Sequence, residues 1–304
     1  MRDTSDKRNV PSGIVGIGAS AGGLEALSEL VEQIPDRTGL CFVIVQHLAA
    51  DHPSIMDQLL GAHTALPVLR SEDGMQVETD SIYVIPSGAT LTIKGTQFQL
   101  KPRDAAPGIR TPIDTFLLSL AGTWREAAAC VILSGTGSDG TQGLRAIKAQ
   151  GGIAAVQDSV SARFTGMPDS AAATGIVDFV LPPGKIARQL SEVMRHRRDL
   201  TRRRGGDTLQ SEIAARLPVS VSLLADEDGP DFSAYKDGTL VRRVERRMVV
   251  LRLDDVNDLI ATLKASREER MRLLQDFLIG VTQFFRDAEV FDALAAEIIP
   301  AMLD

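Results

Sequence analysis

Long hydrophobic runs, cysteine and net positive charge are all scarce in this sequence of 304 residues. The longest apolar runs, such as Leu40–Val45 and Ala127–Leu133, are far shorter than the ~18–20 residues that cross a bilayer. The amino terminus is polar and has no apolar core, so no secretory signal is expected. The two cysteines, Cys41 and Cys130, lie in apolar segments, which is typical of buried thiols in a reducing compartment. We therefore expect a soluble, cytoplasmic protein that does not insert into a membrane.

The charge balance is acidic, with 33 Lys and Arg against 40 Asp and Glu, a formal net charge of −7. An acidic chain is a poor general binder of nucleic acid, so no nucleic-acid partner is expected. The length favours two domains, at ~100–200 residues each. No metal site is predicted.

Residues 13–190 alternate short β-branched segments with helical ones, several of the strands being apolar on both faces. This pattern predicts an α/β fold, a doubly wound and mostly parallel sheet covered by helices on both sides. Residues 89–101 alternate apolar and polar positions around Lys94-Gly95 and predict an added hairpin. The predicted strands are Ile14–Ile17, Cys41–Val45, Ile82–Ile85, Val131–Leu133, Ile153–Val156 and Phe179–Leu181, and the predicted helices are Leu24–Gln33, Ile55–Leu60, Ile113–Ala121 and Gly143–Ala149.

After residue 190 the composition changes, with six arginines between positions 195 and 204 followed by Gly205-Gly206. Nuclear localisation or nucleic-acid contact is one interpretation, but a solvated helix end and linker over residues 191–208 is favoured. From residue 209 to 304 helical periodicity dominates and predicts a small all-α module. Within it, Leu240, Val244, Met248 and Leu251 form an apolar stripe, and Arg242, Arg243, Arg246 and Arg247 lie largely off that stripe.

A glycine-rich turn follows the first predicted strand and permits two interpretations. Gly16, Gly18 and Ala21 match the dinucleotide-binding pattern G-x-G-x-x-A. Gly18-Ala-Ser20-Ala-Gly22 matches G-x-S-x-G, in which small residues expose a nucleophilic serine on a tight turn. A dinucleotide site needs an acid at the end of the second strand, where this chain has Gln46-His47. The histidine favours the nucleophile interpretation.

Three strand-end loops then provide a serine, a histidine and an acid, because the strand at residues 131–133 runs into a glycine-rich loop that contains Asp139. Alone, Asp139 could be a helix N-cap. Together, the three side chains predict a triad in which His47 takes the proton of Ser20 and Asp139 orients the imidazole. The order Ser, His, Asp differs from the α/β-hydrolase order, so that superfamily is excluded. Backbone amides of the two glycine-rich loops are expected to form an oxyanion hole.

With these residues in view, residues 13–190 resemble the catalytic domain of the chemotaxis protein-glutamate methylesterases, the CheB family. The resemblance implies a catalytic Ser20–His47–Asp139 triad, oxyanion donors at the backbone of Ala21 and Thr136, and hydrolysis of glutamate methyl esters, with deamidation of glutamines, on the cytoplasmic helices of methyl-accepting chemoreceptors. No cofactor is implied for the esterase. Many members have Thr at the position of Ala21 and Met at that of Thr136, and a receiver domain in front, which is not expected here. The matching segments are Gly18–Gly23, Val45–His47, Ile82–Pro86, Leu133–Gly140 and Thr165–Pro168.

The all-α module is similar to the amino-terminal helical subdomain of the CheR methyltransferases. The matching segments are Phe232–Lys236, Thr239–Met248 and Leu278–Asp287. This resemblance implies that Arg242, Arg243, Arg246 and Arg247 face the receptor and that Thr282 and Arg286 belong to a vestigial S-adenosylmethionine site. The methyltransferase catalytic domain is expected to be absent, so S-adenosylmethionine would be a cofactor only if that domain were present, and the methyltransferase part is expected to be inactive.

Three alternatives stay open at this stage. One is a generic serine esterase that acts on small molecules. Another is a scaffold that docks receptors without catalysis. The third is a nucleotide-binding protein, against which the missing acid of the second strand argues.

Overall fold

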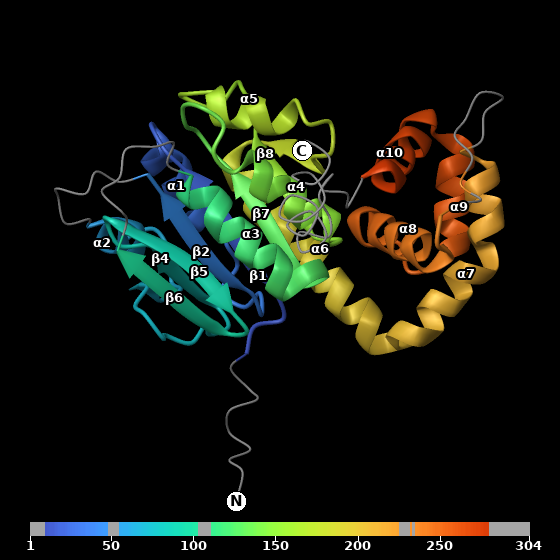
Figure 1. The fold of residues 1–304 in the computed structure, drawn as a ribbon, viewed down its shortest axis with the longest axis horizontal. Coiled ribbons are helices and arrows are strands. Elements are labelled where there is room, and N and C mark those ends of the chain that lie inside the picture. The colour runs from blue at the N-terminus through green and yellow to red at the C-terminus, as the bar shows by residue number, and fades with distance from the viewer. Residues whose placement is uncertain (1–9, 48–54, 103–110, 225–231, 233–234, 280–304) are drawn as a thin grey trace, which may run out of the picture.

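The computed structural model describes residues 10–47, 55–102, 111–224, 232 and 235–279. It has an α/β part and a helical part, joined by one long helix (Figure 1). No helix in these ranges is long and apolar enough to cross a membrane.

A seven-stranded sheet forms the centre of the α/β part, with strand order β3-β4-β2-β1-β7-β8-β9 and every neighbouring pair parallel. This confirms the predicted doubly wound sheet, and it adds a short edge strand, β3, that the sequence pattern did not indicate. The central strands are buried along their whole length, which explains their continuous apolar sequence. The strands are β1 (Ile14–Ala19), β2 (Cys41–Gln46), β3 (Val68–Arg70), β4 (Ser81–Val84), β7 (Ala128–Ile132), β8 (Ile153–Gln157) and β9 (Phe179–Leu181).

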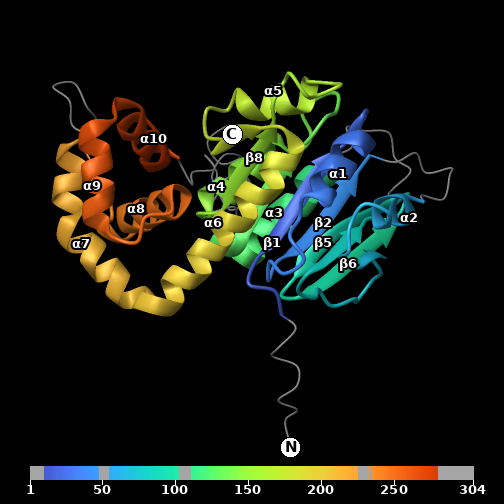
Figure 2. The ribbon, with the colours of Figure 1, turned by 180° about the vertical axis from the view of Figure 1, so that it is seen from behind.

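Side chains alternate between two hydrophobic cores, one on each face of the sheet. In β2, Phe42 and Ile44 belong to one core and Val43 and Val45 to the other, as the two-residue repeat of a strand requires. Helices α1 (Gly23–Glu32), α2 (Met56–Gly61) and α6 (Pro183–Arg204) pack into the first core, and α3 (Pro112–Trp124), α4 (Thr141–Ala149) and α5 (Gly166–Ala172) into the second. Figures 1 and 2 show these two layers from opposite sides.

The predicted hairpin forms strands β5 (Ala89–Lys94) and β6 (Gln97–Pro102), which make a two-stranded antiparallel sheet of their own. Leu91, Ile93 and Phe98 point into the second core, beside α3. The hairpin is therefore attached to the α/β part through side-chain packing and not as further strands of the main sheet.

The region expected to be a linker, residues 191–208, is helical. Helix α6 continues from Pro183 to Arg204, and α7 (Gly206–Ser222) begins after Gly205. At the end of α6, Arg202 and Arg203 are exposed, but Leu190, Val193 and Met194 lie in the first core. The apolar stripe of α6 therefore extends past residue 190. The helical part continues with α8 (Asp237–Leu251), α9 (Val256–Ala265) and α10 (Arg267–Leu278).

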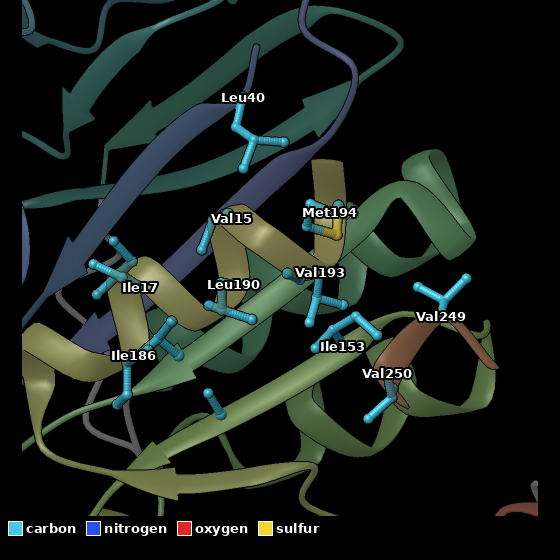
Figure 3. Close-up of a cluster of buried hydrophobic side chains, with 14 of the residues drawn as sticks. Val15, Ile17, Leu40, Ile153, Ile186, Leu190, Val193, Met194, Val249 and Val250 are labelled. Carbon is cyan, nitrogen blue, oxygen red and sulfur yellow. The ribbon is translucent and has the colours of Figure 1, made fainter. Parts of the chain in front are cut away.

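The two parts share one hydrophobic core. Figure 3 shows Val249 and Val250 of α8 beside Ile153 of β8 and Val193 of α6, all of them buried. A continuous core across both parts favours one fixed arrangement over independent motion.

Candidate active site

Three loops meet at the carboxyl edge of the sheet, after β1, β2 and β7. Parallel pairing places Ala19 opposite Gln46 and Gly18 opposite Ile132, so the next residues of all three strands are neighbours. The His47 amide donates to the Ala19 carbonyl at 3.3 Å, and the Ser20 amide donates to the Ser134 carbonyl at 2.9 Å. Strand register therefore brings Ser20 between the histidine loop and the loop after β7.

The nucleophile turn is held by close contacts that exclude larger side chains. A Cβ atom at Gly135 would lie 2.9 Å from the Ser20 Cβ and 2.2 Å from the Met167 sulfur, so only glycine fits. The hydroxyl of the buried Ser134 donates to the Ala21 carbonyl at 2.9 Å and accepts the Phe164 amide at 3.0 Å. These bonds attach the turn that carries Ser20 to the loops after β7 and β8.

His47 and Asp139 form a close hydrogen-bonded pair. The distance from His47 Nε2 to Asp139 Oδ2 is 2.6 Å, with the imidazole 31% exposed and the carboxylate 5% exposed. Because Nε2 is used by the carboxylate, Nδ1 is the ring nitrogen that remains to accept a proton from a serine. A partly exposed base on a buried acid is the arrangement that a general base requires.

Backbone amides hold the Asp139 carboxylate. Oδ1 accepts from the amides of Asp114 and Gly140, each at 2.9 Å, and Oδ2 accepts from the amide of Ile113 at 3.0 Å. Two of these donors belong to the first turn of α3, whose own N-cap residue, Thr111, makes no side-chain cap. The positive end of the α3 dipole therefore stabilises the ionised carboxylate.

The amides expected to form an oxyanion hole lie on accessible parts of the loops after β1 and β7. Ala21 is partly exposed and Thr136 is exposed, on the two loops that flank Ser20. Neither amide donates to a backbone carbonyl in the described part of the chain. Both residues lie beside the nucleophile turn, and their role as oxyanion donors stays a prediction.

The arginines of α8 do not lie where the resemblance placed them. Arg242 is exposed, but Arg243, Arg246 and Arg247 are only 5%, 2% and 2% exposed, so these three do not face a receptor. Arg243 donates to the carbonyls of Lys148 and Ala149, at 2.8 and 2.9 Å. These carbonyls end α4, where a cation is favoured by the helix dipole. Arg247 pairs with Glu269 of α10.

Arg246 is part of a buried cluster of two cations and two carboxylates. Its guanidinium bonds Asp178 of the α/β part and Asp276 of α10, the latter at 2.8 Å, and its Nε donates to the Gly152 carbonyl at 3.0 Å. The Lys148 ammonium bonds the same two carboxylates, at 2.9 and 3.2 Å. The side of α8 expected to meet an acidic partner is thus occupied by the protein's own α/β part.

The remaining predictions concern a cofactor site and a metal site, and two residues of the active site were not predicted. Thr282 and Arg286, assigned to a vestigial S-adenosylmethionine site, lie outside the described residues. The described residues contain no group of three or more His, Cys, Asp or Glu that could hold a metal ion. The sequence reasoning missed Ser134 and Asp114. For Asp114, Thr111-Pro112 followed by an acid in the first turn indicates a helix start, but not contact with a loop 25 residues away.

Comparisons with known proteins agree with this architecture. Residues 15–190 match the CheB methylesterase family, and residues 221–278 match the all-alpha domain of the CheR methyltransferases. An uncharacterized 104.1 kDa protein of Rhodobacter capsulatus is 35% identical over 267 residues, which cover 82% of this chain and 28% of that protein.

Two further relatives have names that state an activity. A protein-glutamate methylesterase/protein-glutamine glutaminase of Rhizobium meliloti is 34% identical, covering 64% of this chain and 56% of that protein. One from Bordetella avium is 34% identical, covering 59% of this chain and 53% of that protein. The chain thus spans about half the length of these two relatives, or less for the Rhodobacter protein. The crystal structure of the Thermotoga maritima CheB methylesterase catalytic domain superposes with a TM-score of 0.56 at 31% identity, covering 60% of this chain and 98% of that domain. Through its α/β part, the chain belongs to the CheB methylesterase family.

Proposed function

We propose that this protein hydrolyses glutamate methyl esters on the cytoplasmic helices of methyl-accepting chemoreceptors, releasing methanol, and deamidates glutamines in the same setting. The observation that carries the proposal is the 2.6 Å His47–Asp139 pair beside the Ser20 turn. The names of the relatives from Rhizobium and Bordetella support the choice of substrate. Such a substrate places the protein in the cytoplasm.

In the proposed mechanism, the Ser20 hydroxyl attacks the ester carbonyl while His47 Nδ1 takes its proton. The Asp139 carboxylate accepts a hydrogen bond from the Nε2–H of His47, which fixes the tautomer, and its negative charge stabilises the imidazolium. The imidazolium then protonates the leaving methoxide, which departs as methanol and leaves an acyl-serine ester. Water, deprotonated by His47, hydrolyses that ester and releases the glutamate carboxylate and the free serine.

Two backbone amides are proposed to stabilise the tetrahedral oxyanion, those of Ala21 and Thr136. The donors are main-chain N–H groups. They are therefore kept although this chain has Ala21 and Thr136 where many family members have Thr and Met. Losing one such donor typically lowers the rate by about 10²–10³-fold.

The test is methanol release from a methylated receptor. Ser20→Ala should reduce turnover below detection and leave the unfolding midpoint unchanged, whereas Ser222→Ala, on the exposed surface of α7, should keep wild-type turnover. Wild-type turnover in Ser20→Ala would exclude the triad. Comparable activity on p-nitrophenyl acetate and none on receptor would favour a generic esterase. Receptor binding without hydrolysis by the wild type would favour a docking scaffold.

We propose that the helical part by itself does not catalyse methyl transfer from S-adenosylmethionine to a receptor. The match over residues 221–278 is to an all-alpha domain, and the roles of Thr282 and Arg286 stay predictions. Incubating these 304 residues with receptor and labelled S-adenosylmethionine should give no labelled receptor. Transfer of the label would contradict this proposal.

A further inference from the structure

A second buried carboxylate, that of Asp114, lies next to the triad acid and is not used by the proposed mechanism. Asp114 is 7% exposed and occupies the third position of α3. Its Oδ1 accepts the Gly143 amide at 2.7 Å. Gly143 is in turn the third residue of α4, and the residue before α4, Gly140, has no side chain with which to cap it.

Asp114 and Asp139 therefore cap each other's helices. Asp139, in the loop before α4, accepts the first-turn amides of α3, at Ile113 and Asp114. Asp114, in α3, accepts a first-turn amide of α4. Each carboxylate takes the place of the N-cap side chain that the other helix lacks, and each lies at the positive end of a helix dipole.

The two helices can form this reciprocal cap because they approach closely at a glycine. A Cβ atom at Gly143 would lie 2.4 Å from the Leu117 Cβ, so α3 and α4 meet where α4 has no side chain. The same approach leaves the Gly143 amide within reach of Asp114. The bond between them determines where the first turn of α3 lies relative to the loop that carries Asp139.

We propose that Asp114 is a positioning residue of the triad: by capping α4 it holds the α3 amides that orient the Asp139 carboxylate toward His47. The proposal rests on the function proposed above. The electrostatic surroundings of the Asp114 carboxylate are consistent with this role. Burial, together with the negative charge of Asp139, raises the pKa of Asp114, and the amides of the α4 first turn act in the opposite direction.

The expected effect follows from how triads depend on geometry. A misplacement of ~1 Å at a catalytic group can lower the rate by about 10²-fold. Asp114→Ala should therefore lower kcat for methanol release by about that factor and leave KM unchanged, because no contact to the substrate is removed. Asp114→Asn keeps an oxygen acceptor for the Gly143 amide and should recover most of the lost kcat.

Asp80 provides a matched control. Its carboxylate also accepts two backbone amides, those of Thr38 and Gly39, at 2.7 and 2.8 Å, but at the start of β2, the opposite edge of the sheet from His47. Asp80→Ala should reduce stability and leave kcat unchanged. The pH profile of kcat/KM should change in Asp114→Ala and not in Asp80→Ala, because only Asp114 bonds the helix start beside the loop that carries Asp139. Among the described residues, the titratable groups that meet here are His47 from the loop after β2, Asp139 from the loop before α4 and Asp114 from α3.

A readout without substrate separates this proposal from the proposed function. The proton of the His47–Asp139 hydrogen bond should give a low-field NMR signal in the full chain, retained in Asp114→Asn and Asp80→Ala and lost or moved upfield in Asp114→Ala. If the wild type hydrolyses no ester but the signal responds in this way, the proposed function fails and the positioning role stands. Unchanged kcat, pH profile and NMR signal in a folded Asp114→Ala protein would overturn the positioning role, and so would failure of Asp114→Asn to restore them.

Discussion

Replacing Arg246 by alanine tests whether the buried charge cluster holds the two parts of the chain together. The substitution removes bonds to Asp178, to Asp276 and to the Gly152 carbonyl. Lys148 would remain as the cation that contacts both carboxylates. A cluster with equal numbers of positive and negative groups would thus become a buried site with one excess negative charge.

The magnitude follows from the burial of the partners. The side chains of Lys148, Asp178 and Asp276 are 1%, 2% and 6% exposed, so water screens their charges little. Removing one partner of a buried ion pair typically lowers the free energy of unfolding by about 3–5 kcal/mol. Against a total stability of about 5–15 kcal/mol, such a loss is large. Because the cluster is buried, added salt should change this loss little.

The assay is urea unfolding followed by two probes: the fluorescence of the single tryptophan, Trp124 at the end of α3, and far-ultraviolet circular dichroism. In Arg246→Ala both midpoints should fall together, since the parts share one core. Arg242→Ala, four residues earlier and exposed, is the control and should change stability by about 0.5 kcal/mol or less. A difference below about 1 kcal/mol between the two variants would refute the reasoning, since it would fall well short of the loss expected for a buried pair.

Two further outcomes concern packing and pH. Gly143→Ala should lower the free energy of unfolding by about 1–3 kcal/mol, because the new methyl group would lie 2.4 Å from the Leu117 Cβ. In Gly122→Ala, in α3, the new Cβ atom would have no atom within 4 Å, so the free energy of unfolding should rise by about 0.5–1 kcal/mol. Equal changes in the two variants, measured by thermal unfolding, would contradict this account. Burial by itself raises the pKa of Asp178. The positive charges of Arg246 and then Lys148 outweigh burial and hold that pKa well below its usual range. The resulting stabilisation is complete above the ordinary carboxyl pKa of ~4 and is lost as pH falls toward the depressed value. Asp178→Asn should therefore flatten the fall in unfolding free energy below pH ~4, and an unchanged slope in urea titrations would show that Asp178 does not contribute.

Most of the α/β part could be predicted because its signals are local. Continuous apolar strands separated by helical segments indicate a parallel sheet, and the carboxyl ends of parallel strands meet at one edge. Ser20, His47 and Asp139 could therefore be grouped from three separate loops. The short edge strand β3 was missed because its three residues are partly exposed and carry no apolar run.

The charged residues of the helical part were interpreted wrongly for a different reason. Periodicity shows that Arg243 and Arg246 lie off the apolar stripe of α8, but it cannot distinguish water from a polar surface of the same protein. Asp178 lies 68 residues before Arg246 in the chain, and no local pattern links them. Of the solvated helix end and linker expected over residues 191–208, the helix end is present at Arg204, but most of the stretch before it is helix, because arginine is a good helix former.

The sequence by itself determined which strand-end loops carry the predicted triad. The serine lies on a small-residue turn, the histidine follows the next strand, and the acid follows a third. These follow from short-range residue patterns and from the geometry of parallel strands. Only the tertiary structure decided how the acid is held and where the arginines point. Both depend on contacts between segments far apart in the chain, α3 with the loop before α4 and α8 with the amino-terminal edge of the sheet, and such contacts form only when the two cores pack.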